Sequence, residues 1–521
     1  MRFEWGKDWP GGAIFAAAAI LVAPLWFTTA PAMPDYPAHL ATFYLISGGA
    51  KLHTLAQFYR IEWGFIPNLA AEIFVPAFGK FVGLTVGVKM FLSAAIAMWV
   101  LGPAYVHRLL YGRFGAGSLA ASFFAYNANF MWGFLNYYFA AGLAFVVFAA
   151  WIASHDRRSN WRLASFAAAV TVVYFCHVFA AAVLGLLIGA YELGIFCEQR
   201  NFSPAEILKR FGEIAAIFVP AAIAFLFLKP AGALGGRFEF NLPDTWQDRI
   251  DSAMLFHFDK PAYFLLAALI LFLAMGVWRG WVSFHPRMKF LLLALAALTI
   301  FAPEWAMGGW GVDLRLPAIL GVFAFTALDI RFGPKTLRIL GAAMLGLLVY
   351  SAAALAGNWR YYDARFDEFR TASQSIPRGA RIFTVLDGDA MGLASDEPYW
   401  HMAELAIVDR GAFTPLMFTT KGQHVVYLKP PFDKWAAGNA NQGSPPDISE
   451  LDDLDAGQID GDKDIRDVFP YLMHFQCHFD EVVLIHLNGR RSPVPDSLRL
   501  RHAGSFFAIY DVAKSDNCGG R

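Results

Sequence analysis

The chain has 521 residues and no net formal charge, since 42 basic side chains balance 42 acidic ones. Hydrophobic residues make up 57% of it and charged residues only 16%, whereas soluble domains are usually about 25% charged. This composition excludes an ordinary soluble protein, and the balanced charge gives no reason to expect nucleic acid as a partner. The sequence therefore indicates a polytopic membrane protein.

Apolar runs long enough to cross a hydrocarbon core of about 30 Å as a helix recur along the chain. Windowed hydropathy predicts about eleven transmembrane helices. They cover residues 12–30, 84–105, 116–132, 135–154, 163–179, 180–196, 211–229, 261–278, 288–303, 315–330 and 337–355. Arg2 and Lys7 precede the first run, which we expect to remain as a membrane helix and not to be removed as a signal peptide.

Basic residues mark every second loop between the predicted spans. They are Arg2 and Lys7, Arg108 and Arg113, Arg157, Arg158 and Arg162, Arg200, Lys209 and Arg210, Arg279, Arg287 and Lys289, and Arg331, Lys335 and Arg338. The positive-inside rule makes that face cytoplasmic. We therefore expect a multi-pass protein of the cell inner membrane, with a cytoplasmic N-terminus and a periplasmic tail.

The sequence after residue 355 changes in composition and predicts two domains, a transmembrane domain (1–355) and a periplasmic soluble domain (356–521). The tail reads as an α/β or α+β fold with helices at 358–375 and 401–408 and strands at 380–386, 424–428, 481–487 and 505–512. Its acidic stretch 447–464 misses the EF-hand pattern and is expected to be a solvated loop. Cys477 and Cys518 share this compartment, and whether they pair stays open.

Asp35 stands directly after the first apolar run, in the sequence Met33-Pro34-Asp35-Tyr36-Pro37-Ala38-His39. Pro37 suits the first turn of a helix, so Asp35 is either an N-cap or a functional carboxylate where a span leaves the bilayer. As a general base it would take the proton of an acceptor hydroxyl that attacks a sugar carbon. His39 lies four residues later on the same helix face, where it either orients Asp35, contacts a phosphate or faces solvent.

The first external loop, residues 31–84, contains two amphipathic helix candidates at 36–48 and 68–82, which we expect to lie flat at the membrane interface. This layout resembles the GT-C membrane glycosyltransferases, which take sugar from a polyprenyl-phosphate carrier. The resemblance implies a long first loop with two flat helices, a catalytic acid after the first span, carried onto Asp35 only, and an external carboxy-terminal domain. The chain departs from the paired acids of many members, because Tyr36 follows Asp35.

Further candidates for binding substrate or phosphate are polar residues at the external ends of the spans. They are Glu304, Asp313 and Arg315 in the turn before the tenth span, Asn129 and Asn136 in an aromatic-rich hairpin, His177, and Lys89. Arg315 would grip a lipid-linked phosphate with two parallel hydrogen bonds, or hold the loop by pairing with Asp313 or with a backbone carbonyl. The asparagines suit sugar recognition, the aromatics also suit an interfacial belt, His177 is alternatively a core residue, and Lys89 either snorkels outward or contacts lipid phosphate.

These residues favour a membrane glycosyltransferase that moves sugar from a polyprenyl-phosphate donor to a periplasmic glycan, lipid or protein acceptor, inverting the sugar carbon with Asp35 as base. The alternatives are a lipid or glycan transporter or flippase, and an O-antigen polymerase or ligase. A non-catalytic assembly protein also remains open. The partners implied are the lipid-linked sugar, the acceptor and membrane lipid. No cofactor is expected, and no ligand spacing demands a divalent metal.

Overall fold

The structure is a computed structural model that describes residues 9–157, 159–200, 202–228, 238–240, 246–253, 261–306, 309–388, 397–435, 445–455, 470–472 and 475–514. Its longer helices are α1 (Trp9–Phe27), α4 (Leu84–Tyr111), α7 (Leu135–Ala153), α8 (Asn160–Cys176), α9 (Val178–Gln199), α10 (Pro204–Ile223, continued by a π-turn Ala224–Leu228), α12 (Pro261–Trp278), α13 (Lys289–Phe301), α14 (Leu316–Thr326) and α15 (Pro334–Ala372). Within these ranges, six helices are long and apolar enough to cross a membrane. The chain is a polytopic membrane protein.

The predicted span at 116–132 is wrong as a single helix. The segment breaks into α5 (Ala116–Ala120), the 3-10 turn η2 (Ala121–Phe124) and α6 (Ala128–Trp132). The break is at Asn127, whose extended backbone ends one helix while its side chain accepts a hydrogen bond from the Phe130 amide and caps the next. An apolar composition does not reveal such a restart, because the capping asparagine is a single residue.

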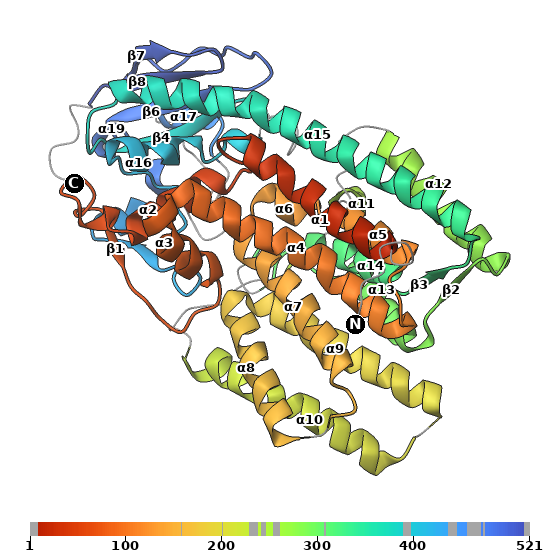
Figure 1. The fold of residues 1–521 in the computed structure, drawn as a ribbon. Coiled ribbons are helices and arrows are strands. Elements are labelled where there is room, and N and C mark those ends of the chain that lie inside the picture. Colours follow the sequence, from red (N-terminus) through yellow and green to blue (C-terminus); the bar gives the residue numbers. More distant parts are fainter. Residues whose placement is uncertain are drawn as a thin grey trace.

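Helix α15 joins the predicted last span and the first predicted helix of the tail, because it runs without interruption across residue 355 (Figure 1). The change from apolar to charged residues marks where the helix leaves the apolar layer, and it does not end the helix. Along its length α15 packs beside α1. The Asp363 carboxylate accepts hydrogen bonds from the amides of Thr29 and Ala30 at 2.6 and 2.8 Å, which fixes the chain just before Asp35.

The tail forms a four-stranded sheet in the order β4 (Ile382–Asp387), β6 (Glu481–His486), β8 (Phe507–Val512), β7 (Leu498–Ala503). Strands β4 and β6 are parallel and the other pairs are antiparallel. The predicted strands are present, but β7 was not predicted, since most of its side chains are charged or exposed. Helix α17 (Ile448–Asp455) begins the acidic stretch expected to be a loop. Cys477 is disulfide-bonded, whereas residues 456–469 and Cys518 lie outside the described residues.

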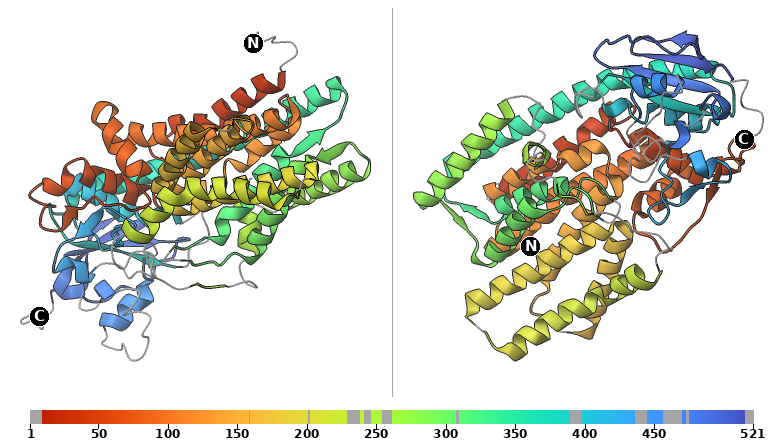
Figure 2. Two further views of the ribbon diagram at one scale, coloured as in Figure 1. Left: turned by 90° about the horizontal axis from the view of Figure 1, so that it is seen from below. Right: turned by 180° about the vertical axis from the view of Figure 1, so that it is seen from behind.

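The first loop packs against the tail. Its helices are α2 (Tyr36–Ile46) and α3 (Ala70–Val82), and its strand β1 (Tyr59–Ile61) pairs antiparallel with β5 (Val426–Leu428) of the tail. Figure 2 shows the red first loop beside the blue tail from two sides. Helix α2 is buried on nearly every side, so the prediction that it lies flat on lipid is wrong; α16 (Leu405–Arg410) covers it.

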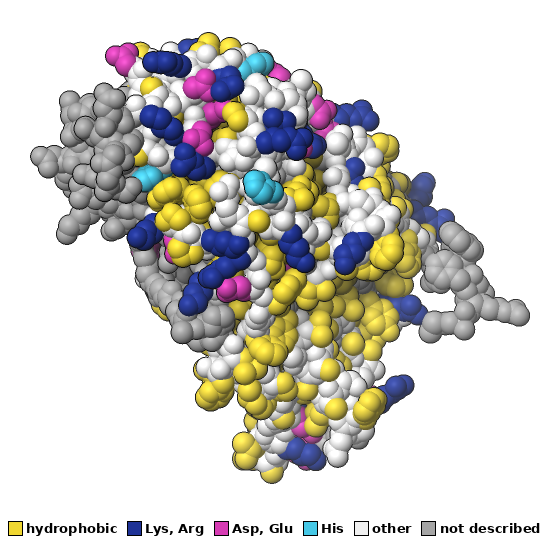
Figure 3. All heavy atoms as spheres, turned by 90° about the vertical axis from the view of Figure 1, so that its left-hand side faces the viewer, with side chains coloured by type: hydrophobic (Ala, Val, Ile, Leu, Met, Phe, Trp, Pro, Cys, Tyr) yellow, Lys and Arg dark blue, Asp and Glu magenta, His cyan; other side chains and the backbone are white. Residues whose placement is uncertain are grey.

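Charged side chains gather over the tail and first loop, whereas the surface over α8 and α10 is largely hydrophobic (Figure 3). Exposed apolar side chains on the helical part include Phe15, Val146, Val172, Val219 and Phe227. Exposed apolar surface on this scale is what a lipid-facing helix presents. The face of α3 with Ile73, Phe78 and Phe81 is also exposed. This exposure agrees with the prediction that α3 is an interfacial helix.

The pairing of β1 with β5 predicts a specific cross-link. Arg60 and Tyr427 are direct partners in this ladder, and opposed Cα atoms of antiparallel strands lie about 5 Å apart, within disulfide reach. We expect an Arg60→Cys, Tyr427→Cys variant to form a disulfide that holds the two halves together after proteolysis between them, seen as a reducible band on a gel. An Arg60→Cys, Lys429→Cys control, displaced by two residues at about 3.3 Å each, should not; equal cross-linking of both pairs would contradict the register.

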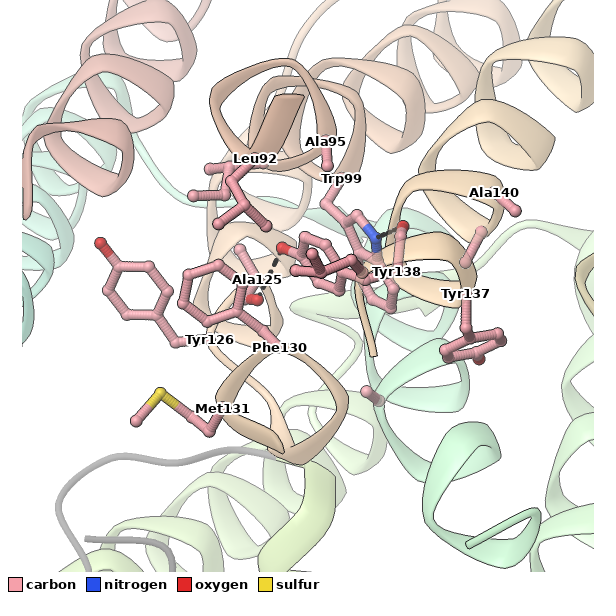
Figure 4. Packing of buried hydrophobic residues seen from close by; sticks show 14 of the residues in the cluster. Leu92, Ala95, Trp99, Ala125, Tyr126, Phe130, Met131, Tyr137, Tyr138 and Ala140 are labelled. Carbon is pink, nitrogen blue, oxygen red and sulfur yellow. Dashed lines mark hydrogen bonds between the residues drawn. The ribbon is translucent and has the colours of Figure 1, made fainter. Parts of the chain in front are cut away.

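Buried aromatic rings beneath the first loop fix the turn between α6 and α7 (Figure 4). The Trp99 ring stacks on Tyr138 at 4.8 Å between ring centres, and its Nε1 donates to the Tyr138 carbonyl at 2.8 Å. The Tyr138 hydroxyl in turn donates to the Ala125 carbonyl at 2.8 Å. Because aromatic residues bury large areas and the polar groups of these rings are hydrogen-bonded, this turn is a firm support for the first loop.

Candidate active site

Asp35 lies at the start of α2 and does not act as its cap. Its backbone is helical (φ −79°, ψ −11°) and its side chain makes no capping hydrogen bond, whereas an N-cap residue normally has an extended backbone. The Asp35 amide donates to the Trp132 carbonyl at 3.1 Å, and Gly133, at φ +92°, packs so closely that a Cβ there would lie 3.1 Å from the Asp35 Cβ. The carboxylate is thus held in place but left available.

The charged neighbour of this carboxylate comes from the tail. His401 Nε2 lies 4.0 Å from Asp35 Oδ1, and His401 Nδ1 lies 3.5 Å from Glu404 Oε1. His401 and Glu404 are both fully buried, while Asp35 keeps 17% of its side chain exposed. The Thr414 hydroxyl donates to Glu404 Oε1 at 3.3 Å. A line of two carboxylates with an imidazole between them therefore ends at a partly exposed carboxylate, Asp35.

Burial and charge set the protonation of this line. Burial raises the pKa of Asp35 to about 7, and the charge of His401 acts to lower it. Burial acts to lower the pKa of His401, but the hydrogen-bonding contact and charge of Glu404, and then the charge of Asp35, raise it above its ordinary value. A carboxyl group that titrates near neutral pH is suited to general base catalysis.

The His39 amide donates to the Asp35 carbonyl at 3.0 Å, but among the described residues the His39 ring makes no hydrogen bond to the Asp35 carboxylate, which corrects the predicted orienting contact. The ring is buried and does not face solvent. Its Nε2 lies 3.1 Å from the Gly133 carbonyl, to which it donates, and its ring contacts Phe43 and Phe418. The His39 ring is instead occupied by the Gly133 carbonyl, and Gly133 packs against Asp35.

Three tryptophans from distant parts of the chain meet beside Asp35. The Trp132 ring is edge-on to Trp310 at 5.1 Å and to Trp400 at 5.5 Å. Trp310 donates from Nε1 to Glu304 Oε1 at 2.9 Å. The Trp400 Nε1 group is buried without a hydrogen-bond partner among the described residues. Such an arrangement combines ring surfaces with an unused donor, and both are groups that bind sugars.

Arg315 is buried at the start of α14 within a cage of aromatic rings. Its guanidinium lies 5.4 Å from the Phe134 ring centre, 5.2 Å from Tyr137 and 5.6 Å from Phe179. Its Nη2 donates to the Trp310 carbonyl at 3.1 Å, and its Nε has no hydrogen-bond partner among the described residues. The predicted Asp313–Arg315 pair is wrong: Asp313 Oδ2 lies 3.2 Å from Arg249 Nε instead.

A buried cation without a carboxylate partner is costly unless an anion binds there. Arg249 cannot share that role, because its guanidinium already donates to the carbonyls of Thr299, Ile300 and Ala302. The turn Trp132–Phe134 links the two groups of interest, since Trp132 accepts from the Asp35 amide and Phe134 contacts the Arg315 guanidinium. The candidate site is therefore one continuous cluster from the first loop, the α6–α7 turn, the start of α14 and the tail.

The remaining predicted residues line this cluster or support it. Asn129 donates to the Leu314 carbonyl at 3.1 Å, while its own side-chain oxygen is buried without a partner among the described residues. His177 caps α9 by accepting from the Phe179 amide at 3.1 Å, and its ring contacts Tyr137. Both residues thereby hold groups that surround Arg315.

Asn136 and Lys89 are already engaged within the protein. The Asn136 amide nitrogen donates to the Asn68 carbonyl and to Glu72 Oε2 at 3.0 and 2.8 Å, which uses both of its hydrogens and ties α3 to α7. Burial raises the pKa of Glu72 to about 7, opposed by this bond from Asn136. Lys89 Nζ donates to the Thr28 carbonyl at 2.5 Å, so the ammonium closes the end of α1.

Sequence reasoning missed His401 and Glu404. The only local signal was a histidine and a glutamate three residues apart in an apolar stretch, and the sequence cannot show that this pair folds against the first loop. Among the described residues no group of three or more His, Cys, Asp or Glu side chains could hold a metal ion.

No family model and no curated protein matches the chain. Among solved structures, it is similar to apo ArnT from Cupriavidus metallidurans, with a TM-score of 0.51, 12% identity, and coverage of 96% of this chain and 97% of that one. The chain shares the fold of that protein. ArnT bound to undecaprenyl phosphate aligns with a TM-score of 0.48 and 11% identity over the whole of both chains.

The arabinofuranosyltransferase AftD from Mycobacteria also aligns, with a TM-score of 0.48 and 15% identity; all of this chain matches 40% of that protein. The likeness to apo ArnT extends over nearly the whole chain, so the tail and the helical part belong to one architecture. The GT-C resemblance noted in the sequence is thereby supported at the level of the fold, and the roles of single residues are argued from their own contacts.

Proposed function

We propose that the chain is a membrane glycosyltransferase that moves a sugar from a polyprenyl-phosphate donor to a periplasmic glycan, lipid or protein acceptor. The observation that carries this proposal is the joint presence of a partly exposed carboxylate, Asp35, and a buried guanidinium, Arg315, that has no carboxylate partner among the described residues. One turn links the two groups. A transfer of sugar from a phosphate needs a base for the acceptor and a cation for the leaving phosphate. The GT-C-type fold agrees with this chemistry.

In the proposed reaction the Asp35 carboxylate takes the proton from an acceptor hydroxyl. The acceptor oxygen forms a bond to the anomeric carbon as the bond from that carbon to the phosphate oxygen breaks. The electron pair of the broken bond remains on the phosphate, where the Arg315 guanidinium stabilises the charge. A single displacement of this kind inverts the sugar carbon. The tryptophans between the two groups would hold the sugar by stacking.

The membrane arrangement supports an outward-facing site. Helix α4 has 28 residues and is therefore about 42 Å long, with Lys89 near its start and Arg108 near its end. Arg113, beyond that end, pairs with Asp329 at 2.7 Å. Both residues lie at the face of the protein whose loops are rich in basic residues and which is expected to be cytoplasmic. Asp35 and Lys89 lie at the other end, which supports a periplasmic tail. The polar candidates gather there and not at the midplane, unlike in transporters.

The proposal is tested by comparing a deletion strain with the same strain carrying the wild-type chain. We expect mass spectrometry to find a polyprenyl-phosphate sugar accumulating in the deletion strain and one sugar missing from its envelope glycans. The purified protein should then release free polyprenyl phosphate from that accumulated lipid when an acceptor is added. Unchanged lipid-linked sugars together with a transport defect would favour the flippase alternative.

A further inference from the structure

We infer that His401, supplied by the tail, is the positioning residue that keeps Asp35 ionised and aimed at the acceptor. The inference rests on the proposed function and concerns how the same site is regulated by pH. Its starting observation is geometric: His401 Nε2 lies 4.0 Å from Asp35 Oδ1 and its other nitrogen lies 3.5 Å from Glu404 Oε1. Neither ring nitrogen has a conventional hydrogen bond among the described residues.

A fully buried imidazole between two carboxylates is stabilised in its protonated form. The buried Glu404 supplies the first negative charge, and Thr414 and the turn of η8 (Met402–Glu404) hold it in place. With Glu404 ionised, a proton on His401 leaves that pair neutral and presents a positive edge to Asp35. An opposite charge at about 4 Å favours the ionised form of a carboxyl group. His401 thus counteracts the burial that would otherwise neutralise the base.

The other described groups that face this pair do not supply that charge. His39 from α2 and His424 from the turn before β5 are both within ring contact of Phe418. Burial, and then His424 and His401, lower the pKa of His39 to about 3, and burial lowers the pKa of His424 to about 4, so both are neutral. Tyr59 from β1 and Tyr471 from η10 (Pro470–Leu472) face Glu404 with neutral hydroxyls.

The tail is therefore part of the chemistry and not only a cover. The β1–β5 ladder and the packing of α16 on α2 bring the two halves together, and Trp400, next to His401, contacts Trp132. A motion that separates the tail from the first loop would remove the positive charge from Asp35 and raise its pKa. Docking of the tail and readiness of the base are thus coupled in this fold.

The test is the pH dependence of kcat/KM for sugar transfer by the full-length purified protein. For wild type we expect the acidic limb near pH 7, with activity falling as Asp35 becomes protonated below it. For His401→Gln we expect this limb to move up by about one pH unit, because the opposing charge is gone. Transfer at pH 6.5 should then fall about tenfold more than transfer at pH 9.

The matched control is His424→Gln, which removes a buried histidine of the same cluster that faces no carboxylate; its limb should not move. If His401→Gln fails to fold, Glu404→Gln serves instead, since it withdraws the charge that keeps His401 protonated and should move the limb in the same direction. A purely structural His401 would lower the plateau and leave the limb in place, which would overturn the inference. Failure of wild type itself to transfer sugar would instead reject the proposed function.

Discussion

An Asp35→Asn variant is expected to lose sugar transfer by about 10²- to 10⁴-fold, the range typical of removing a general base. Asparagine keeps the shape of the side chain but cannot accept the proton of the acceptor hydroxyl. The fold should survive, because the Asp35 side chain does not cap α2 and the contact with Trp132 uses the backbone amide. The measurement is complementation of a deletion strain at matched expression, with lipid-linked sugars and envelope glycans profiled by mass spectrometry.

The donor lipid should accumulate in the Asn strain as it does in the deletion strain. Asp35→Glu is the informative companion, since it keeps a carboxylate but displaces it by one methylene towards the tryptophans, and we expect partial activity with an acidic limb. Full rescue by Asn would remove Asp35 from the chemistry. The Asn136→Asp variant is a control at the α3–α7 contact; it adds a carboxylate beside Glu72 and should lower thermal stability without abolishing transfer at permissive temperature.

Hydropathy and charge were sufficient to predict the membrane class and most helix positions, because each span obeys a local rule of length and apolar content. The errors occur where a local rule is overridden by one residue or by a distant partner. Asn127 divides the predicted third span. Helix α15 continues past the predicted boundary because polarity can change along a helix without ending it. Helix α2 has the composition of an interfacial helix, but the tail covers it.

The candidate site divides in the same way. Asp35 was predicted as a candidate from its position after the first span, and Arg315 from its position at the mouth of a later one. The neighbours of the candidate residues were not predicted, because they are remote in sequence. His401 lies beside Asp35, and Arg249 pairs with Asp313 in place of Arg315. Pairing of a first-loop residue with one from the tail depends on tertiary packing, which leaves no periodic pattern in the sequence.

The Arg315→Met variant is expected to lower kcat by about 10²- to 10³-fold, as removal of one preorganised donor to a developing oxyanion does. Methionine fills much of the space between Phe134, Tyr137 and Phe179 but carries no charge. The fold should tolerate the change, because the guanidinium has no carboxylate partner among the described residues to leave behind. Arg315→Lys keeps the charge without the planar fork, so we expect an intermediate loss.

The measurement that separates a phosphate ligand from a packing residue is inhibition by the product. If Arg315 binds the leaving phosphate, free polyprenyl phosphate should inhibit Arg315→Met more weakly than wild type, in parallel with the fall in kcat. Lys89→Met is the matched control, because its ammonium is already bonded to the Thr28 carbonyl and lies 6.0 Å from the Trp26 ring centre; product inhibition there should change little. Unaltered inhibition in Arg315→Met with a lowered melting temperature would make Arg315 a packing residue.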